Sequence, residues 1–516
     1  MVFLAAEGRD LFDLIDWIGK QSWSDGKVGL RGASYTGTNQ WYAALLKPPN
    51  LKCITPSATV GRATELIPYR YGAFKLEWAL SWIGKALNTP NNKLNWTNNS
   101  PSDWLDQRPL NTLDYFVTGR NLSLYQEFLQ HSTYDAYWKS LDISAAMYSN
   151  INIPSMAFTG WFDGTMFGTI LRFEEARQFS LNRKDHFLFL GPYLHSNAPD
   201  GGYDFVTGEA MKRIGAFEFP DNAFVPGQNM TREFFDWCLK NITKRPAWSQ
   251  SNVYLTGANE WIRGNKFLPD DGLEEKIFYL SNPSSYLTSG KLAFNPPEQP
   301  HNNTLRYDPR QPVRSDADKM IQLPIDLSFY FKKGNDFLVY TSEPFNRPTT
   351  IIGNLYVDLS ISSEAKDTDF VILLMVVNED GRSIRLGSQI SYELRARYRN
   401  GFDREELMEK GKIYNLTILI NEIGHTFHKG HSLRIAITNS FFPWTSANQN
   451  TGNPIATDTS EPVVSQQTIY YGKTDADSFH RSRVRFTTYH FKNSSSSNKM
   501  KIFFFLITFV IITFII

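Results

Sequence analysis

The pattern of apolar and polar positions gives the chain a front part in which helices and strands alternate. Apolar residues follow helical spacing over 10–21, and a short apolar strand at 28–30 leads into a glycine-rich turn. A helix through 40–46 and a strand at 51–55 come next. This order of strand, sharp turn, helix and strand is typical of a parallel α/β sheet.

A long insertion interrupts this pattern. Between 69 and 141 the apolar and aromatic residues follow helical spacing, and we predict helices covering the carboxyl edge of the sheet, with no strand. The α/β pattern then resumes, with expected strands at 153–160 and 186–190 and expected helices near 168–179 and 230–240.

Beyond about residue 250 the pattern changes to short strands separated by Gly, Pro and Asn turns, which predicts an all-β sandwich of the jelly-roll type. The expected strands include Val253–Leu255, Ile277–Leu280, Leu355–Ile361, Phe370–Val377 and Leu433–Ile437.

Composition narrows the functional classes. A chain of 516 residues is too long for one core, and its net charge of +1 gives no support for nucleic-acid binding. Its two cysteines, Cys53 and Cys238, exclude a disulfide framework and a Cys-rich zinc site, but one bridge between them stays open. The aromatic share of 15% fits large β-rich cores or an apolar pocket.

The turn Gly32–Gly37 places Ser34 between a strand and a helix. Small residues on both sides let the chain turn sharply and expose the serine hydroxyl, as a hydrolase nucleophile requires. The alternative is a small-residue turn without chemistry. A serine nucleophile also needs a base, an orienter for that base and donors for the oxyanion.

In α/β-hydrolases the partners follow in the order serine, acid, histidine, on loops beyond strand ends. Asp163 follows the strand ending at Gly160, and His195 follows the strand at 186–190. His131 precedes the acid, and His186 begins a strand at the wrong edge. The alternatives are an Asp-Gly turn and a loop histidine. We predict Ser34, Asp163 and His195 as the catalytic residues.

Three histidines, His425, His428 and His431, are spaced by three in the back part. Zinc binding is the alternative for these histidines, but no cysteine joins them and no carboxylate lies among them. We interpret them as a turn of the sandwich, and we expect neither a metal nor a cofactor.

Several motifs resemble the cocaine esterase / X-Pro dipeptidyl-peptidase family of serine hydrolases, from about Glu7 to Thr488. In the front part these are Gly29–Trp41, Gly160–Gly164 and Gly191–Ser196. In the back part they are Leu338–Pro344, Asp367–Phe370, Leu394–Arg399 and Gly430–Arg434.

The resemblance implies an α/β-hydrolase domain over 1–64 and 150–247, a helical cap over 65–149 and a jelly-roll domain over 248–492. It implies hydrolysis of esters or of amides, including peptides with proline second, through an acyl-enzyme. It assigns the roles to Ser34, Asp163 and His195, with the backbone N–H of Tyr35 as one oxyanion donor.

The family's second oxyanion donor is a tyrosine on a loop well before the nucleophile, and residues 1–31 hold no tyrosine. We therefore expect that the front of the protein is missing, together with the first strands of the sheet. The strand before Ser34 would then be an exposed apolar edge. Loss of one donor typically costs ~10²–10³ in turnover.

The substrate pocket is expected to be lined partly by the cap aromatics Trp78 and Trp82, and also by Trp161. Esterase and dipeptidyl-peptidase differ in whether a buried carboxylate, such as Glu77, captures the substrate amine. The alternative to an enzyme is a non-catalytic cell-surface protein whose jelly roll binds a ligand and whose hydrolase part is a relict.

The end of the chain predicts a membrane partner. A polar spacer is followed by the apolar stretch 502–516, which fits a lipid-anchor signal or a short tail anchor, within an anchor segment 493–516. No secretory signal is found at Met1. Acceptor sequons support a secretory route and a cell-surface location, and they lie at Asn95, Asn98, Asn121, Asn229, Asn241, Asn302, Asn415 and Asn493.

Overall fold

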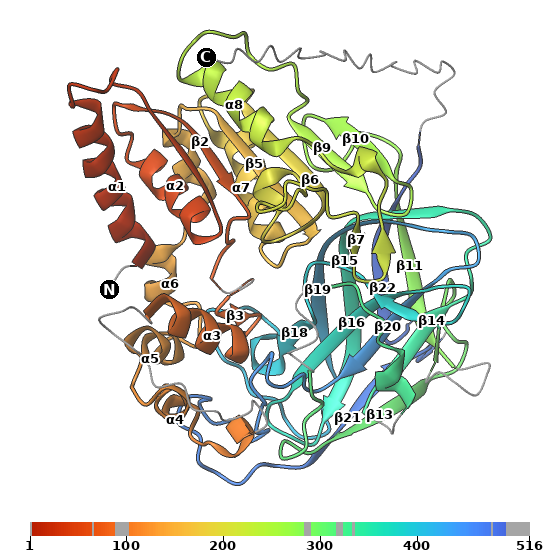
Figure 1. Cartoon of the computed structure of the whole chain (residues 1–516). Coiled ribbons are helices and arrows are strands. Elements are labelled where there is room, and N and C mark those ends of the chain that lie inside the picture. The colour runs from red at the N-terminus through yellow and green to blue at the C-terminus, as the bar shows by residue number, and fades with distance from the viewer. Residues whose placement is uncertain are drawn as a thin grey trace, which may run out of the picture.

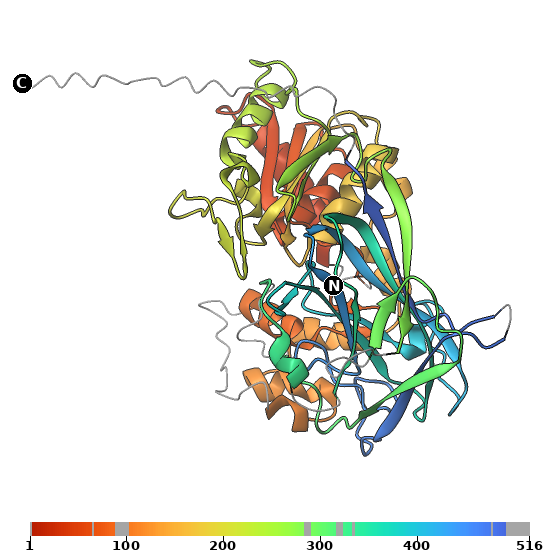
Figure 2. The ribbon, with the colours of Figure 1, turned by 90° about the vertical axis from the view of Figure 1, so that its right-hand side faces the viewer.

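The computed structural model describes residues 3–491 except 64, 66, 88–102, 283–289, 316–322, 333–335 and 476–477. In this part of the chain an α/β domain, a group of short helices and a β-sandwich pack together (Figure 1). The short helices lie beside the sandwich, and the α/β domain lies above both, as the view turned by 90° also shows (Figure 2). The predicted combination of α/β and all-β parts is confirmed.

The α/β domain is built on a six-stranded sheet in the order β1-β2-β5-β6-β9-β10. Neighbouring strands are parallel except the antiparallel pair β9–β10. The strands are β1 (Val28–Ala33), β2 (Leu51–Ser57), β5 (Ser155–Phe162), β6 (His186–Leu194), β9 (Ser251–Leu255) and β10 (Glu260–Gly264). At the β1 edge, Val28 is buried and Leu30 half-buried, so the apolar side chains there are less exposed than expected.

Both faces of this sheet are covered. The helices of the domain are α1 (Phe3–Gly19), α2 (Tyr35–Leu45), α7 (Met166–Phe179) and α8 (Gly227–Cys238). On β6, Phe187 and Phe189 pack in the cluster that contains α8, whereas Leu188 and Leu190 pack in the cluster that contains α7. Strands that are buried on both faces have nearly uninterrupted apolar sequences, so these strands could be predicted from the sequence.

One strand expected in the sandwich belongs to the α/β sheet instead. β9 contains Val253–Leu255 and pairs in parallel with β6, with Val253 opposite Leu190. All five β9 residues are buried. A short apolar run carries no polarity pattern that separates a parallel sheet from a sandwich core. The α/β sheet therefore continues to Gly264, past the expected boundary at 247.

The insertion is helical, as predicted. It holds α3 (Leu76–Leu87), α4 (Leu113–Thr118), α5 (Ser123–Gln130) and α6 (Ala136–Leu141). A small hairpin of β3 (Tyr69–Arg70) and β4 (Ala73–Phe74) precedes them. The expectation of no strand between 69 and 141 is wrong at the start of this range, since two strands of two residues carry no readable alternation of polarity.

The back part forms a β-sandwich. The strands are β11 (Leu273–Ser281), β12 (Gly290–Ala293), β13 (His301–Tyr307), β14 (Leu338–Ser342), β15 (Thr349–Ser363), β16 (Asp369–Val377), β17 (Ser383–Arg385), β18 (Tyr392–Arg395), β19 (Tyr414–Phe427), β20 (Ser432–Thr438), β21 (Ser465–Tyr471) and β22 (Arg483–Tyr489). The expected strands at 277–280, 355–361, 370–377 and 433–437 are confirmed as β11, β15, β16 and β20. Neighbouring strands are mostly antiparallel, and β12 pairs with β14 in parallel.

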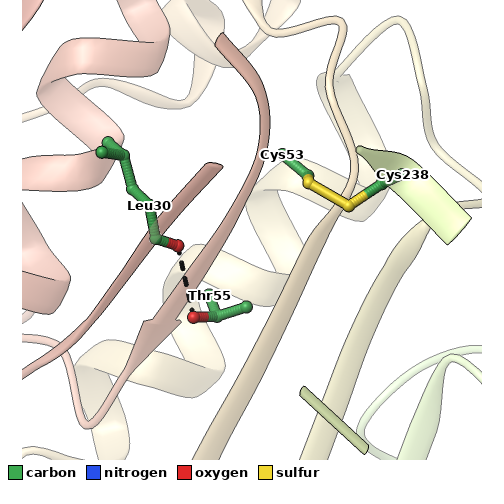
Figure 3. Close-up of a disulfide and its surroundings, with 4 residues drawn as sticks. All are labelled: Leu30, Cys53, Thr55 and Cys238. Atoms are coloured by element: carbon green, nitrogen blue, oxygen red, sulfur yellow. Dashed lines mark hydrogen bonds between the residues drawn. A yellow bond between two sulfur atoms is a disulfide. The ribbon is translucent and has the colours of Figure 1, made fainter. Parts of the chain in front are cut away.

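Cys53 and Cys238 form a disulfide, which the sequence left open. It joins β2 to the end of α8, beside the hydrogen bond from the Thr55 hydroxyl to the Leu30 carbonyl (Figure 3). Two elements 185 residues apart are thus linked covalently.

Among the described residues, no helix is long and apolar enough to cross a membrane. The expected anchor segment 493–516 and the sequons at Asn95, Asn98 and Asn493 lie outside these residues.

Candidate active site

Ser34 lies at the turn between β1 and α2, with φ 60° and ψ −124°. Such a backbone costs a non-glycine residue on the order of 1–3 kcal/mol and is common at functional sites. A Cβ on Gly32 would lie 2.6 Å from the Thr36 carbonyl oxygen. A Cβ on Gly37 would lie 2.5 Å from the Ser57 carbonyl oxygen. Both positions therefore require glycine, and the turn presents Ser34 at the N-terminal end of α2.

Tyr35 is the first residue of α2, so its backbone N–H belongs to the turn whose amides point out of the helix end. Its hydroxyl donates a hydrogen bond to the Glu7 carboxylate on α1. Burial and the Glu7 hydrogen bond raise the pKa of Tyr35, which keeps the phenol neutral. This contact ties α1 to the residue that follows Ser34.

Asp163 and His195 form an ion pair beyond the ends of β5 and β6. His195 Nδ1 lies 2.7 Å from Asp163 Oδ1. Burial raises the pKa of Asp163, but the charge of His195 and the hydrogen bonds to the carboxylate outweigh this and lower it. Burial likewise lowers the pKa of His195, and the charge of Asp163 with its hydrogen bond raises it above the ordinary value. The Asp163 carboxylate therefore stabilises the protonated imidazolium form of His195.

Two threonines fix the Asp163 carboxylate, which is completely buried. The Thr159 hydroxyl donates to Oδ2 at 2.9 Å, and the Thr165 backbone N–H donates to Oδ1 at 2.9 Å. The Thr165 hydroxyl has two acceptors within donating distance, Oδ1 of Asp163 and the Ala58 carbonyl oxygen, each at 2.8 Å. These contacts leave the carboxylate one orientation, with Oδ1 toward His195.

Ser34 and His195 line the same cavity, which has a volume of about 440 Å³. Its other lining residues are Tyr35, Thr38, Tyr42, Val60, Gly61, Ala63, Ile67, Pro68, Trp78, Trp82, Phe128, Tyr137, Trp138, Leu141, Asp142 and Thr165. Among the residues that the structure describes, no hydrogen bond joins Ser34 to His195. Such contacts are often long in a free enzyme and tighten on the substrate.

Comparison with known proteins identifies the family. Residues 1–197 match the family model described as "X-Pro dipeptidyl-peptidase (S15 family)". Residues 249–480 match the family model described as "X-Pro dipeptidyl-peptidase C-terminal non-catalytic domain". The chain is also 29% identical over 489 residues to the cocaine esterase of Rhodococcus sp. (strain MB1 Bresler), covering 87% of this chain and 79% of that protein. The chain belongs to the cocaine esterase / X-Pro dipeptidyl-peptidase family. It is therefore a serine hydrolase, of the dipeptidyl-peptidase or the esterase type.

Solved structures share the fold of this serine hydrolase. An aminopeptidase from the marine sediment archaeon Thaumarchaeota archaeon has a TM-score of 0.81 at 22% identity, covering 94% of this chain and 80% of that chain. An α-amino acid ester hydrolase has a TM-score of 0.77 at 22% identity, covering 93% and 79%.

Two of the three predicted pocket residues line the cavity of the hydrolase. The indole rings of Trp78 and Trp82 on α3 stack with centroids 5.5 Å apart and an interplanar angle of 12°. The Tyr35 ring lies 5.8 Å from that of Trp82. These rings form an aromatic wall close to Ser34.

The prediction for Trp161 is wrong. Its indole N–H donates to the Tyr254 carbonyl at 2.5 Å, and its ring lies where a Cβ on Gly424 would be only 2.3 Å away. The sequence placed the end of the strand at Gly160, which would have left Trp161 on the loop. β5 continues to Phe162, so Trp161 lies within the strand, where its ring packs against Gly424 on β19 of the sandwich.

The acidic side chain in the cavity wall is Asp142, whereas Glu77 does not line the cavity. Asp142 Oδ2 accepts from the Tyr134 hydroxyl at 2.8 Å, and Oδ1 accepts from the Ala63 N–H at 3.3 Å. Burial raises its pKa, although these hydrogen bonds and nearby arginines act against that. No sequence signal marked Asp142, which directly follows the short helix α6.

The other histidines considered lie away from Ser34. His186 is buried between the Ser155 and Ser180 hydroxyls, and burial lowers its pKa to about 3. His131 pairs with Asp135 in the cap at 2.6 Å. Of the nine histidines, only His195 is among the residues that line the cavity with Ser34.

His425 contacts the Thr256 hydroxyl at 2.8 Å, and burial lowers its pKa to about 3. Within the described ranges, no group of three or more His, Cys, Asp or Glu side chains is placed to hold a metal ion.

Proposed function

We propose that Ser34 is the nucleophile, His195 the general base and Asp163 the residue that orients His195. The observation that carries this assignment is that a serine in a strained turn and a histidine paired with a buried aspartate line one cavity. A serine hydroxyl is a weak nucleophile alone, and a base held by a carboxylate makes it a strong one.

The reaction follows from this arrangement. Nδ1 of His195 is engaged by Asp163, so Nε2 takes the Ser34 proton as Oγ attacks the carbonyl carbon. The backbone N–H of Tyr35 donates to the oxyanion. His195 then gives the proton to the leaving group, and the acyl chain stays on Ser34. A water molecule, activated by the same imidazole, releases the acid.

The preferred substrate is an ester with an apolar, aromatic-sized acyl group. The cavity wall is mostly aromatic and aliphatic, and the stacked Trp78–Trp82 pair offers a flat surface near Ser34. A related protein is named a cocaine esterase, which agrees with ester hydrolysis.

The second candidate is hydrolysis of amides or short peptides that carry a free amine. Asp142 supports it, since a carboxylate in the cavity wall attracts an ammonium group. The Tyr134 hydroxyl and the Ala63 N–H already satisfy this carboxylate in part, which favours the ester.

A substrate panel tests both candidates. Benzoyl and acetyl esters are compared with Ala-Pro and Gly-Pro amides, with Ser34→Ala as the inactive control. We expect the benzoyl ester to have the highest kcat/KM. A preference for the Pro amides that disappears in Asp142→Asn would favour the peptidase instead.

A fluorophosphonate probe tests the enzyme against a relict domain. Labelling of the wild type at Ser34, absent in Ser34→Ala, supports the nucleophile. Folded wild-type protein that stays unlabelled would support a non-catalytic binding protein.

We also propose a membrane-anchored glycoprotein of the secretory route or cell surface, held by the segment 493–516. Two observations support this. The sequon asparagines within the described residues are all exposed, namely Asn121, Asn229, Asn241, Asn302 and Asn415. The Cys53–Cys238 disulfide fits an oxidising compartment.

Enzymatic removal of N-glycans from the protein of its own cells tests the location. We expect increased electrophoretic mobility after treatment and recovery in the membrane fraction. Protein in the cytosolic fraction with free thiols at Cys53 and Cys238 would contradict it.

A further inference from the structure

A glutamine of the sandwich reaches the loop that carries Asp163. Gln389 is 4% exposed, and its Nε2 donates to the Gly164 carbonyl oxygen at 2.5 Å. The two residues are 225 positions apart. Gly164 is itself buried and lies between Asp163 and Thr165. The back part of the chain thus holds the backbone next to the predicted triad acid.

The loop needs this contact because it is short and buried. The Asp163 carbonyl accepts from the Met166 N–H at 3.0 Å, where α7 begins. The Thr165 hydroxyl donates to the Ala58 carbonyl at 2.8 Å. Gln389 donates to the Gly164 carbonyl, which lies between these two hydrogen bonds. A buried carbonyl without a hydrogen-bond donor would destabilise the fold.

The segment that carries Gln389 is fixed in the sandwich. The Leu386 N–H donates to the Leu374 carbonyl on β16 at 2.9 Å. Residues 388–391 are all buried, and β18 follows at Tyr392. Gln389 lies in the bend between β17 and β18, and a donor held between two strands of the sandwich can fix the orientation of the loop it contacts.

We infer that Gln389 is a positioning residue for the reaction, which acts on His195 through the loop of Asp163. The matched C-terminal domain carries the description "non-catalytic", yet it supplies this contact. Gln389 is not among the cavity-lining residues, so it does not touch the substrate. The inference rests on the proposed roles of Ser34, Asp163 and His195.

The test replaces Gln389 by Met, which has a similar length but no donor. We expect kcat to fall on the order of 10-fold to 100-fold, since small displacements of catalytic groups have effects of this size. KM stays within about twofold, because the cavity wall is unchanged.

The pH profile gives a second readout. Asp163 is the charged group that acts on His195, and Asp142 also lines the cavity. A loosened Asp163 supports the imidazolium less, so the acidic limb of kcat/KM moves to lower pH in Gln389→Met.

Thr256→Val is the matched control. The Thr256 hydroxyl also donates across the same two parts of the chain, to the Gly424 carbonyl at 2.9 Å, but it does not touch the Asp163 loop. We expect a similar loss of thermal stability in both variants, with kcat and the pH limb unchanged in Thr256→Val.

Gln389→Asn serves where Met prevents folding. It keeps a polar side chain but is one methylene too short to reach Gly164, so it gives the same expected result. If a folded Gln389 variant keeps wild-type kcat and pH limb while Asp163→Asn loses activity, Gln389 is merely structural and the inference is overturned. If Asp163→Asn also stays active, the proposed triad itself is wrong.

Discussion

His195 Nδ1 and Asp163 Oδ1 lie 2.7 Å apart, although the residues come from the ends of different strands. Because the pair raises the pKa of His195 above its ordinary value of 6.5, the neutral base forms only at higher pH. We predict that kcat/KM for an ester rises with pH, with a midpoint above 6.5. Steady-state rates across pH 5–9, roughly the range in which imidazoles titrate, measure this limb.

The Asp163→Asn variant tests the origin of that limb. It removes the charge that raises the His195 pKa, while burial, which lowers it, remains. The limb therefore moves to lower pH, and turnover falls by about 10⁴-fold, as in serine proteases with the corresponding change. If the midpoint of the rise in kcat/KM with pH is the same in Asp163→Asn, a group other than His195 is responsible for that rise.

Trp82→Ala should reduce activity selectively on aromatic acyl esters. The ring stacks on Trp78 and lies near Tyr35, so its loss opens the wall against which a benzoyl group would pack. An aromatic contact contributes about 0.5–1.5 kcal/mol, so we expect up to about a tenfold fall in kcat/KM for a benzoyl ester. An acetyl ester should change much less. Trp17→Ala on the exposed face of α1 is the control and should leave both rates unchanged.

Removing the disulfide should lower stability without changing the site. Cys53→Ala with Cys238→Ala frees β2 from α8, and loss of such a link typically costs about 2–4 kcal/mol. Urea unfolding with and without reductant measures it. Reductant should shift the wild type toward the variant and leave the variant itself unchanged.

Lys75 and Glu393 form a buried ion pair between the cap and the sandwich. Nζ lies 2.6 Å from Oε2, and both side chains are completely buried. Lys75→Met leaves the buried Glu393 carboxylate with only the weaker ionic contact to Arg70, at 3.6 Å. We therefore expect the free energy of unfolding to fall by about 3–5 kcal/mol. Lys75→Met with Glu393→Gln should cost less than the sum of the single changes. Additive losses by urea unfolding would show that the two side chains act separately.

The Lys75 pair also makes stability depend on pH. Burial lowers the Lys75 pKa from 10.5 to about 8, although Glu393 acts against this. Between these values the unfolded chain holds a proton that the folded chain has released, so stability increases as pH rises. The wild type should gain stability relative to Lys75→Met from pH 8 to 10.5. A constant difference across this range would show that Lys75 does not titrate there.

The sequence by itself determined the local features of this protein. A serine between small residues, after an apolar strand and before a helix, marked Ser34, because a sharp turn demands those residue types. Loop positions beyond two apolar strands marked Asp163 and His195, since parallel strands bring their carboxyl ends to one edge. These signals lie within a few residues of each site.

Only the tertiary structure decided which distant segments meet. It assigned β9 to the α/β sheet, turned Trp161 toward Gly424, brought Asp142 into the cavity wall and linked Cys53 to Cys238. It also placed Gln389 against Gly164. The spacing of apolar residues along the chain indicates how deeply a segment is buried, but it does not show which other segment covers it. The covering segment is decided by packing between residues that are far apart in the chain.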